Sequence, residues 1–356
     1  MTLPKTTAVW AITPDGLKLA RTLVEALPGC TLFASDALGS DPLAGPRFSR
    51  LKPAVADYFS RFDAHVFIAA VGIVVRVIAP LIEKKAVDPA VVVLDDRAQH
   101  TVSLLSGHLG GANALCREVA ALLDSRPVIT TATDLHGVTA IDLVAREREL
   151  AIENPEAIRH VSMALLAGEP AVLVDPYRLL AGAFAEGETV DAASADADPD
   201  RPAVVVDDRI IPMGRRTLLL RPRSLVAGIG CNRNTPADVL KASLFDALDR
   251  FRLAMASLAA LASIDVKSDE PGLLALASEL NLPLHFFSGE QLKSAGAVPN
   301  PSAVVQQHVG VESVCEAAAI LGARHGQLIV PKQRTPDTTV AVARIGSISS
   351  ASDPAA

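Results

Sequence analysis

A glycine-rich turn near the middle of the first half of the chain carries the side chains best suited to proton chemistry. Residues 103–113 are SLLSGHLGGAN. His108 can gain and lose a proton near neutral pH, and Ser106 adds a hydroxyl. The apolar residues before the turn predict a buried strand, and the spacing of apolar residues over Ala112–Leu123 predicts a helix after it. At such a helix N-terminus, free N–H groups and the helix dipole favour a carboxylate or a phosphate.

The glycines of this turn have two explanations. Gly107, Gly110 and Gly111 allow unusual backbone angles and let a ligand approach the backbone. A tight strand-to-helix connection, with His108 as a bystander, requires the same glycines. Both explanations stay open. No Lys follows the glycines, so the turn is not a P-loop.

Two further strand ends carry glycine or polar residues. Strands are predicted at His65–Ala70 and Pro127–Thr130. In an open α/β sheet, ligands bind at the carboxyl ends of the strands. We therefore expect these two ends and the glycine turn to lie at one edge of the same sheet. The residues concerned are Gly72 and Arg76 after the first strand, and Thr130, Thr131 and Asp134 after the second.

A second glycine turn is predicted after the strand Leu225–Ile229, with Gly228 and Gly230 in it. A dinucleotide fingerprint would need glycine where Arg233 stands, so that motif is excluded. Arg233 is a candidate for binding an acidic ligand, and a solvated surface Arg is an equal alternative.

Three charged residues follow in the last third of the chain. Lys267 and Glu270 precede a predicted helix and could orient a substrate or pass protons, although acidic residues at a helix start are also ordinary partners of the helix dipole. Glu316 lies on a helix predicted at Val311–Ala323.

Composition limits the classes of function. The chain has 356 residues, half of them hydrophobic, and 40 acidic against 33 basic residues give a net charge of −7. This balance argues against a nucleic-acid partner. The apolar run over Phe67–Ile82 is interrupted and too short to span a membrane, and the N-terminus lacks the apolar core of an export signal. Four isolated cysteines indicate a reducing cytoplasm and give no metal or disulfide framework.

Alternating strands and helices predict an α/β protein of three domains. We expect a Rossmann-like parallel-sheet domain at residues 1–136, a small α+β domain at 137–222, a second α/β domain at 223–346 and a tail at 347–356. Ala90–Leu94 and His100–Leu105 read as a hairpin within the first domain. The acidic stretch at 191–200 and the tail are predicted to be flexible.

Taken together, these residues resemble one family, the cobalt-precorrin-5A hydrolases of anaerobic cobalamin biosynthesis (the CbiG type). The resemblance spans nearly the whole chain in three blocks, and its combination of motifs is more specific than any one of them. The matching stretches are VGIVVR at 71–76, DPAVVV at 88–93, LLSGHLGGAN at 104–113, ITTATD at 129–134, GIGC at 228–231, ASIDVKSDE at 262–270, PNPS at 299–302 and SVCEAAA at 313–319.

The resemblance implies hydrolytic opening of the δ-lactone of a cobalt-containing macrocycle, with loss of acetaldehyde and cobalt-precorrin-5B as product. The implied partner is a cobalt-corrinoid substrate. The cobalt arrives with the substrate, so no cofactor is expected. A homo-oligomer and transient contacts with neighbouring enzymes of the route are further partners to consider.

Residue roles are hypotheses from the chemistry of lactone opening, which needs a base for water, donors to the oxyanion and a proton for the leaving oxygen. We assign His108 as the base, with Ser106 and Asp134 as further catalytic residues, and the N–H groups around Gly110 and Gly111 as donors. The predicted substrate-binding residues are Gly72, Arg76, Gly107, Gly110, Gly111, Asn113, Thr130, Thr131, Gly228, Gly230, Arg233, Lys267, Glu270 and Glu316.

Two other classes of function remain open. A non-catalytic tetrapyrrole carrier would bind the corrinoid without releasing acetaldehyde. A phosphate- or nucleotide-binding α/β enzyme would fit the glycine turns, although the Walker and dinucleotide patterns are missing.

Overall fold

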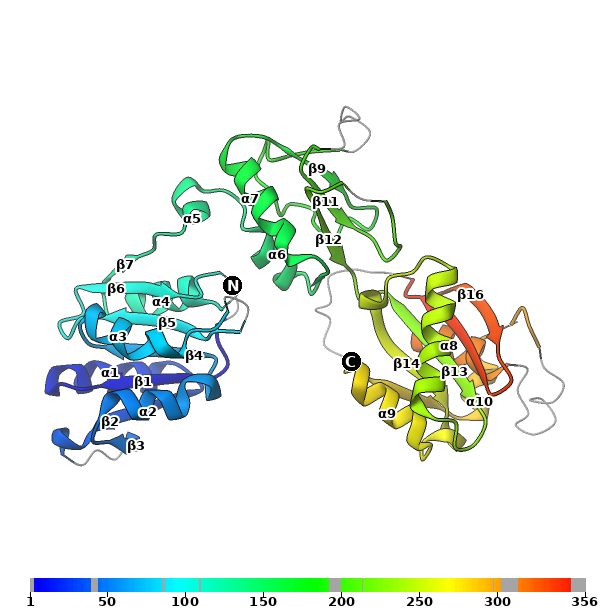
Figure 1. Ribbon diagram of the computed structural model, residues 1–356, viewed down its shortest axis with the longest axis horizontal. Helices are drawn as coiled ribbons and strands as arrows, with labels where there is room; N and C mark the ends of the chain where they lie inside the picture. Colours follow the sequence, from blue (N-terminus) through cyan, green and yellow to red (C-terminus); the bar gives the residue numbers. More distant parts are fainter. Residues whose placement is uncertain are drawn as a thin grey trace. The chain divides into compact units, whose positions relative to one another are not determined.

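Two compact units make up the chain. The computed structural model describes residues 3–39, 44–84, 87–108, 110–191, 200–212, 214–296, 298–301 and 313–346. Contacts divide the chain into Met1–Glu147 and Arg148–Ala356, which we call the N-terminal and C-terminal units (Figure 1). The tail at 347–356 and residues 192–199 of the acidic stretch lie outside the described residues.

The N-terminal unit is a doubly wound α/β sheet. All neighbouring strands are parallel except β5 and β6, which pair antiparallel as the predicted hairpin. The strand order is β3-β2-β1-β4-β5-β6-β7. The strands are β1 (Thr7–Ala11), β2 (Cys30–Ser35), β3 (Ala44–Phe48), β4 (Ala64–Ile68), β5 (Ala90–Leu94), β6 (His100–Leu105) and β7 (Arg126–Val128).

Helices cover both faces of this sheet. One core contains buried residues of α1 (Pro14–Ala26) and α4 (Ala112–Leu122), and the other contains those of α2 (Leu51–Tyr58) and α3 (Val71–Ile78). Apolar residues at helical spacing, such as Leu17, Ala20 and Leu23 in α1, produce these buried stripes. Two short helices, α5 (Ala132–His136) and α6 (Ile141–Glu147), follow β7.

The C-terminal unit contains two sheets. The first has the order β10-β9-β11-β12-β8 and is parallel except at β8. Its helix α7 (Ile158–Leu166) contacts β9 and β12. The strands are β8 (Ala151–Ile152), β9 (Ala171–Val174), β10 (Thr189–Asp191), β11 (Ala203–Val206) and β12 (Thr217–Arg221).

The second sheet of this unit has the order β15-β14-β13-β17-β16. Cores lie on both of its faces: α8 (Ala237–Arg250) and α9 (Pro271–Leu280) belong to one, and α10 (Gly289–Lys293) and α12 (Val314–Gly322) to the other. The strands are β13 (Leu225–Cys231), β14 (Leu258–Ile264), β15 (Leu284–Phe287), β16 (Gln327–Arg334) and β17 (Thr338–Arg344).

A buried carboxylate in the segment between β11 and β12 joins the first of these sheets to the second. Asp208 is 0% exposed and accepts two hydrogen bonds from the Arg344 guanidinium of β17, at 2.6 and 2.8 Å. Ser224 Oγ donates to the same carboxylate at 2.9 Å. Bidentate pairing and a third donor compensate for the desolvation of this charge.

The mixed α/β class is confirmed, and three local expectations are corrected. Residues 44–48, for which no strand was predicted, form β3; its Pro46 is tolerated because β3 is the outermost strand. β14 was not predicted, because its alanine-rich sequence has low strand preference and forms a strand only through pairing and burial. The turn expected at Gly228 begins later, since β13 continues to Cys231.

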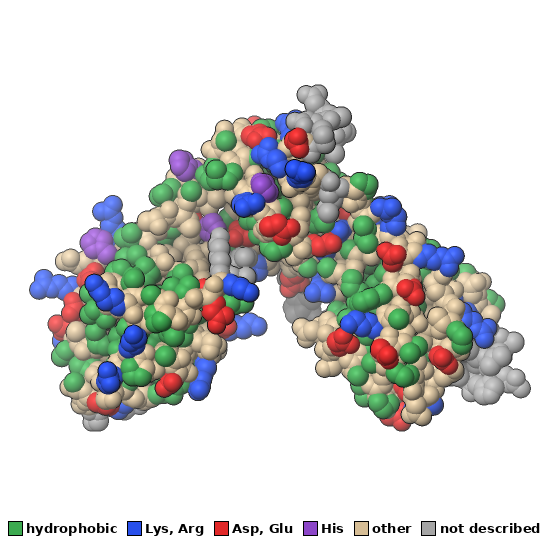
Figure 2. Space-filling view, in the orientation of Figure 1, with side chains coloured by type: hydrophobic (Ala, Val, Ile, Leu, Met, Phe, Trp, Pro, Cys, Tyr) green, Lys and Arg blue, Asp and Glu red, His purple; other side chains and the backbone are tan. Residues whose placement is uncertain are grey.

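Charges are mixed on the surface. On the face shown in Figure 2, Lys and Arg side chains are interspersed with Asp and Glu across the described residues of both units. Within the described part of the chain, no helix combines the length and the apolar character needed to cross a membrane.

The aromatic core of the N-terminal unit contains a buried neutral histidine. Trp10 Nε1 donates to His65 Nδ1 at 3.1 Å, so the other ring nitrogen carries the proton and donates to the Phe59 carbonyl at 3.0 Å. Burial lowers the pKa of His65 from 6.5 to about 4, against a smaller upward effect of the bond to Phe59. Protonation therefore favours the unfolded chain.

We expect the free energy of unfolding to carry a His65 contribution that is complete above pH 6.5 and falls as the pH decreases toward 4. Between pH 6.5 and 5 the loss should be about 2 kcal/mol. Trp10 is the only Trp of the chain, so urea unfolding followed by its fluorescence reports the N-terminal unit. His65→Gln should remove this part of the pH dependence, whereas exposed His136→Ala should keep it. Equal pH slopes for wild type and His65→Gln would contradict the assignment.

Gly228 permits the closest approach between β13 and α12. A Cβ added there would lie 1.9 Å from the carbonyl oxygen of Cys315. We expect Gly228→Ala to destabilise the C-terminal unit by about 1–3 kcal/mol or more, because backbone must move apart. Gly346→Ala in the same unit is the control, since its nearest neighbour would be 4.0 Å away. Thermal unfolding followed by circular dichroism tests this, and equal midpoints for the two variants would refute it.

Candidate functional site

The glycine-rich turn closes on itself before α4 begins. Ser106 has a φ of 56° and Gly111 a φ of 89°, both in the left-handed region. The N–H groups of Ala112 and Asn113 donate to the carbonyls of Ser106 and Gly107 at 3.1 and 2.9 Å. The first N–H groups of α4 are therefore used within the turn.

The glycines are required by this packing. A Cβ on Gly107 would lie 2.7 Å from Asn113 Oδ1, and one on Gly110 would lie 2.4 Å from the Ser106 Cβ. The Gly111 N–H donates to the His108 carbonyl at 2.9 Å. This corrects the expectation that the Gly111 N–H is free for an oxyanion: a tight turn must satisfy its own buried donors.

Ser106 also has a structural partner. Its hydroxyl donates to the Asp88 carbonyl at 2.9 Å, and the residue is 8% exposed. This bond ties the turn to the segment that precedes β5. A catalytic role for Ser106 stays a prediction.

His108 lies between two carboxylates from α5 and α6. Its Nε2 is 3.1 Å from Asp134 Oδ2 and 3.0 Å from Thr133 Oγ1. Its Nδ1 is 3.7 Å from Asp142 Oδ2. The side chains of His108, Asp134 and Asp142 are 11%, 17% and 4% exposed, so the ring is largely shielded from water.

Asp134 is the best-connected carboxylate of this group. Its Oδ2 accepts from Asn113 Nδ2 at 2.9 Å and from Thr131 Oγ1 at 2.8 Å, and Arg117 pairs with its Oδ1. Burial raises the pKa of Asp134, but hydrogen bonds from Thr131, Arg117 and His108 lower it by more, so the pKa lies below its ordinary value. Asp134 is therefore ionised at neutral pH.

An ionised Asp134 determines the tautomer of His108. A carboxylate can only accept, so Nε2 carries a proton and donates it. In the neutral ring, Nδ1 then has the lone pair and faces Asp142. In a general base of this kind, a carboxylate orients the imidazole through one ring nitrogen, and the other ring nitrogen transfers the proton.

Strand direction separates two groups of predicted residues. Because β6 is antiparallel to β5 and β7 is parallel to β6, the turn after β6 and the segment after β7 share one edge of the sheet. Gly72 and Arg76 follow β4, which is parallel to β5, so they lie at the opposite edge. The expectation of three strand ends at one edge is wrong for this pair, because the predicted hairpin reverses the chain direction.

Several of the predicted site residues do not contact His108. Arg76 Nη1 donates to the Gly72 carbonyl of its own helix at 2.7 Å. Thr130 is exposed just before α5, whereas Thr131 bonds to Asp134. Gly228 lies within β13 against α12, where it serves packing.

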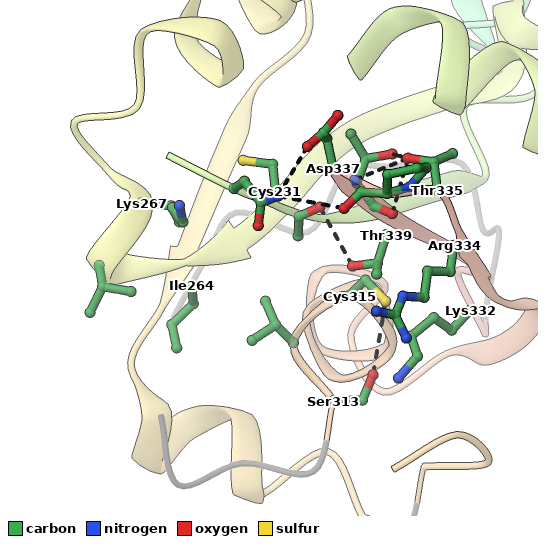
Figure 3. Close-up of a pocket in the computed structure, with 16 residues that line it drawn as sticks. Cys231, Ile264, Lys267, Ser313, Cys315, Lys332, Arg334, Thr335, Asp337 and Thr339 are labelled. Carbon is green, nitrogen blue, oxygen red and sulfur yellow. Dashed lines mark hydrogen bonds between the residues drawn. The ribbon is translucent and has the colours of Figure 1, made fainter. Parts of the chain in front are cut away.

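The second sheet of the C-terminal unit, which contains β13 to β17, has a pocket of about 310 Å³ at one edge. It is lined by the ends of β13 and β16, the start of β17, the segment after β14 and the first turn of α12. Of the residues predicted from the sequence, Gly230 and Lys267 line it. Lys267 is labelled in Figure 3. Lys332, Arg334 and Asp337 add charge to its walls.

Glu270 is a fully buried carboxylate behind this pocket. It accepts from the Asn234 N–H at 2.5 Å, and its Oε2 lies 3.5 Å from Arg233 Nη1 and 3.7 Å from Lys267 Nζ. Arg233 is further bound to Asp269 at 2.5 Å. Arg233 is thus engaged within the protein, while Lys267 is held at the pocket wall.

Glu316 is also 0% exposed, at the start of α12. Its carboxylate accepts from the backbone N–H of Lys332 at 3.0 Å and from the side chain and backbone of Asn300 at 2.8 and 3.2 Å. Lys332 Nζ in turn donates to the Asn300 carbonyl at 2.7 Å. Glu270 and Glu316 therefore position other residues in this structure, and direct contact of either with a substrate stays a prediction.

Some residues of these two sites were not predicted from the sequence. Asp142 gave no signal, because it belongs to a helix whose position beside the turn depends on the fold. For Lys332 and Arg334 the sequence does contain a signal, because residues two apart on a strand share a face. Both line the pocket.

Comparison with known proteins covers almost the whole chain. Residues 53–134 match the family described as Cobalamin synthesis G N-terminal, residues 139–222 match Cobalamin biosynthesis central region, and residues 225–343 match Cobalamin synthesis G C-terminus. A protein of Salmonella typhimurium named cobalt-precorrin-5A hydrolase is 36% identical over 95% of this chain and 97% of its own length.

Two further similarities extend over similar lengths. A cobalt-precorrin-5A hydrolase of Priestia megaterium is 31% identical over 95% of this chain and 94% of its own. A crystal structure of a cobalamin biosynthesis protein G homologue from Sulfolobus solfataricus is 21% identical, covers 96% of this chain and 97% of its own, and superposes with a TM-score of 0.38. By its identity to full-length relatives, this chain belongs to the cobalt-precorrin-5A hydrolase (CbiG) family.

Proposed function

We propose that this chain is a cobalt-precorrin-5A hydrolase, which opens the δ-lactone of cobalt-precorrin-5A, releases acetaldehyde and yields cobalt-precorrin-5B in anaerobic cobalamin biosynthesis. The observation that carries this proposal is the match to two relatives of that name over 95% of the chain, at 36% and 31% identity. The substrate brings its own cobalt, so the proposal includes no cofactor of the protein. We place the reaction in the cytoplasm, on the evidence of the isolated cysteines.

His108 is the proposed base for the attacking water. Asp134 fixes the proton on Nε2, which leaves the lone pair on Nδ1 to accept a proton from water. Asp142, at 3.7 Å from Nδ1, would stabilise the imidazolium that forms. The shielding of both carboxylates from water strengthens this effect.

The atoms of the ring-opening step balance without another reactant. The water oxygen bonds to the lactone carbonyl carbon, and one water proton passes to Nδ1 of His108. The bond between that carbon and the ring oxygen then breaks, and the leaving oxygen takes the proton from His108. The histidine returns to its starting state for the next substrate.

Acetaldehyde release is the direct test of the proposed function. Purified full-length protein is incubated anaerobically with cobalt-precorrin-5A, and acetaldehyde is trapped by alcohol dehydrogenase and measured as NADH consumption. We expect one acetaldehyde per corrinoid converted. Binding of the corrinoid without any release would instead favour the non-catalytic carrier, and saturable ATP or NAD binding would favour a nucleotide enzyme.

The role of His108 makes a second prediction. His108→Ala should lower kcat by roughly 10²-fold or more, the usual contribution of general base catalysis. Asp134→Asn should lower kcat in the same direction and change the pH profile, because the proton on Nε2 is no longer fixed. His136→Ala, an exposed histidine of α5, is the matched control and should keep wild-type turnover. With folding verified by Trp10 fluorescence, near wild-type turnover of His108→Ala would refute the assignment.

A further inference from the structure

We infer that the pocket of the C-terminal unit is a subsite for the carboxylate arms of the tetrapyrrole substrate, with Lys332 and Arg334 as its principal anion-binding side chains. The identity of the ligand rests on the proposed function. The site itself rests on the cavity, on the charges that line it and on the partners of those charges.

Strand topology places the pocket where ligands of α/β sheets bind. β13 and β14 are parallel, and β16 runs in the same direction because β17 is antiparallel to both β13 and β16. The carboxyl ends of these three strands therefore meet at one edge of the sheet. The pocket of about 310 Å³ opens there.

Positive charge dominates the wall of the pocket. Lys267, Lys332 and Arg334 line it, and Asp337 is the one carboxylate among its described lining residues. Asp337 Oδ1 accepts from the neutral Asn232 Nδ2 at 3.1 Å, so this single carboxylate faces three cations across the pocket. Figure 3 shows Lys267 on one side of the pocket and Lys332 with Arg334 on the other.

The two cations of β16, Lys332 and Arg334, have no acidic partner among the described residues. Lys332 Nζ donates to a neutral group, the Asn300 carbonyl, at 2.7 Å. Among the residues that the structure describes, no carboxylate oxygen forms an ion pair with Lys332 or Arg334, whereas Lys267 has Glu270 at 3.7 Å. Two adjacent unneutralised cations in one pocket favour an anionic ligand.

The remaining lining adds to this preference. Ser313 is the N-cap of α12 and lines the pocket, so the positive end of this helix dipole lies at the pocket wall. Cys231 and Cys315 do not offset the positive charge, because burial raises the pKa of both thiols and keeps them neutral.

Apolar side chains distinguish this pocket from a site for a free anion. Ile264, Val266, Val314 and Pro336 line it together with the cations. A carboxylate on a short aliphatic arm meets both kinds of surface, whereas inorganic phosphate uses only the charges. At about 310 Å³ the pocket is at the lower end of ligand sites, a size suited to one edge of a macrocycle.

The test uses the full-length chain and the octacarboxylate uroporphyrin III as a probe, with binding measured by fluorescence anisotropy. We expect Lys332→Gln/Arg334→Gln to raise the probe Kd by at least about tenfold, from loss of two charge-assisted contacts. Lys293→Gln/Arg215→Gln removes the same charge from exposed positions of the same unit outside the pocket and should bind like wild type. The single variant Arg334→Gln, at an exposed position, covers the case in which the double variant fails to fold.

Kinetics and competition separate the outcomes. With cobalt-precorrin-5A, the double variant should raise KM about tenfold and leave kcat within twofold of wild type. Unchanged probe binding and unchanged KM would overturn the inference. Loss of inorganic phosphate binding with unchanged uroporphyrin III binding would also overturn it, since the pocket would then be a phosphate site. The wild-type protein could release no acetaldehyde while the double variant still binds uroporphyrin III more weakly than wild type. That result would refute the proposed function and support the subsite.

Discussion

The antiparallel pairing of β5 with β6, Val91 opposite Leu105 and Leu94 opposite Thr101, controls which side chains of the N-terminal unit can meet. Every strand before this hairpin runs one way, and β6 and β7 run the other. The turn after β6 and the segment after β7 consequently share an edge, and His108 reaches Asp134. Gly72 and Arg76, which follow β4, belong to the other edge. One hairpin thus separates two motifs that look equivalent along the chain.

At the edge that carries the turn after β6, the ionisation of Asp134 and the orientation of His108 depend on each other. Asp134 collects donors from Thr131, Asn113, Arg117 and His108, and these bonds outweigh the cost of burying its charge. The resulting carboxylate orients the imidazole and fixes its proton. In a phosphate-binding loop, glycines let the backbone N–H groups approach the ligand. The glycines of the turn after β6 instead allow the turn to close and to satisfy its own N–H groups. The chemistry lies in the side chains that this closure brings together.

The C-terminal unit uses buried carboxylates to place surface cations. Glu316 lies beneath β16 and accepts from the Lys332 backbone and from Asn300, whose carbonyl in turn receives the Lys332 ammonium. Glu270 lies beneath the opposite wall and faces Lys267 and Arg233. Each carboxylate is 0% exposed, so its oxygens face protein groups rather than solvent. A ligand at this pocket would meet cations that are already held in place.

The sequence by itself determined the α/β class, most strands and helices, the hairpin and the family resemblance, because hydrophobic period, glycine and proline placement and motif order are local properties. It also singled out His108 and Asp134, whose side chains the structure places 3.1 Å apart. Tertiary structure alone decided that Asp142 faces His108 and that Gly228 serves packing. The position of Gly72 and Arg76 at the other edge already follows from the predicted hairpin. The alanine-rich β14 became a strand only through its neighbours. Contacts between side chains of different helices and the burial of a charge depend on residues far apart in the chain, and no local pattern encodes them.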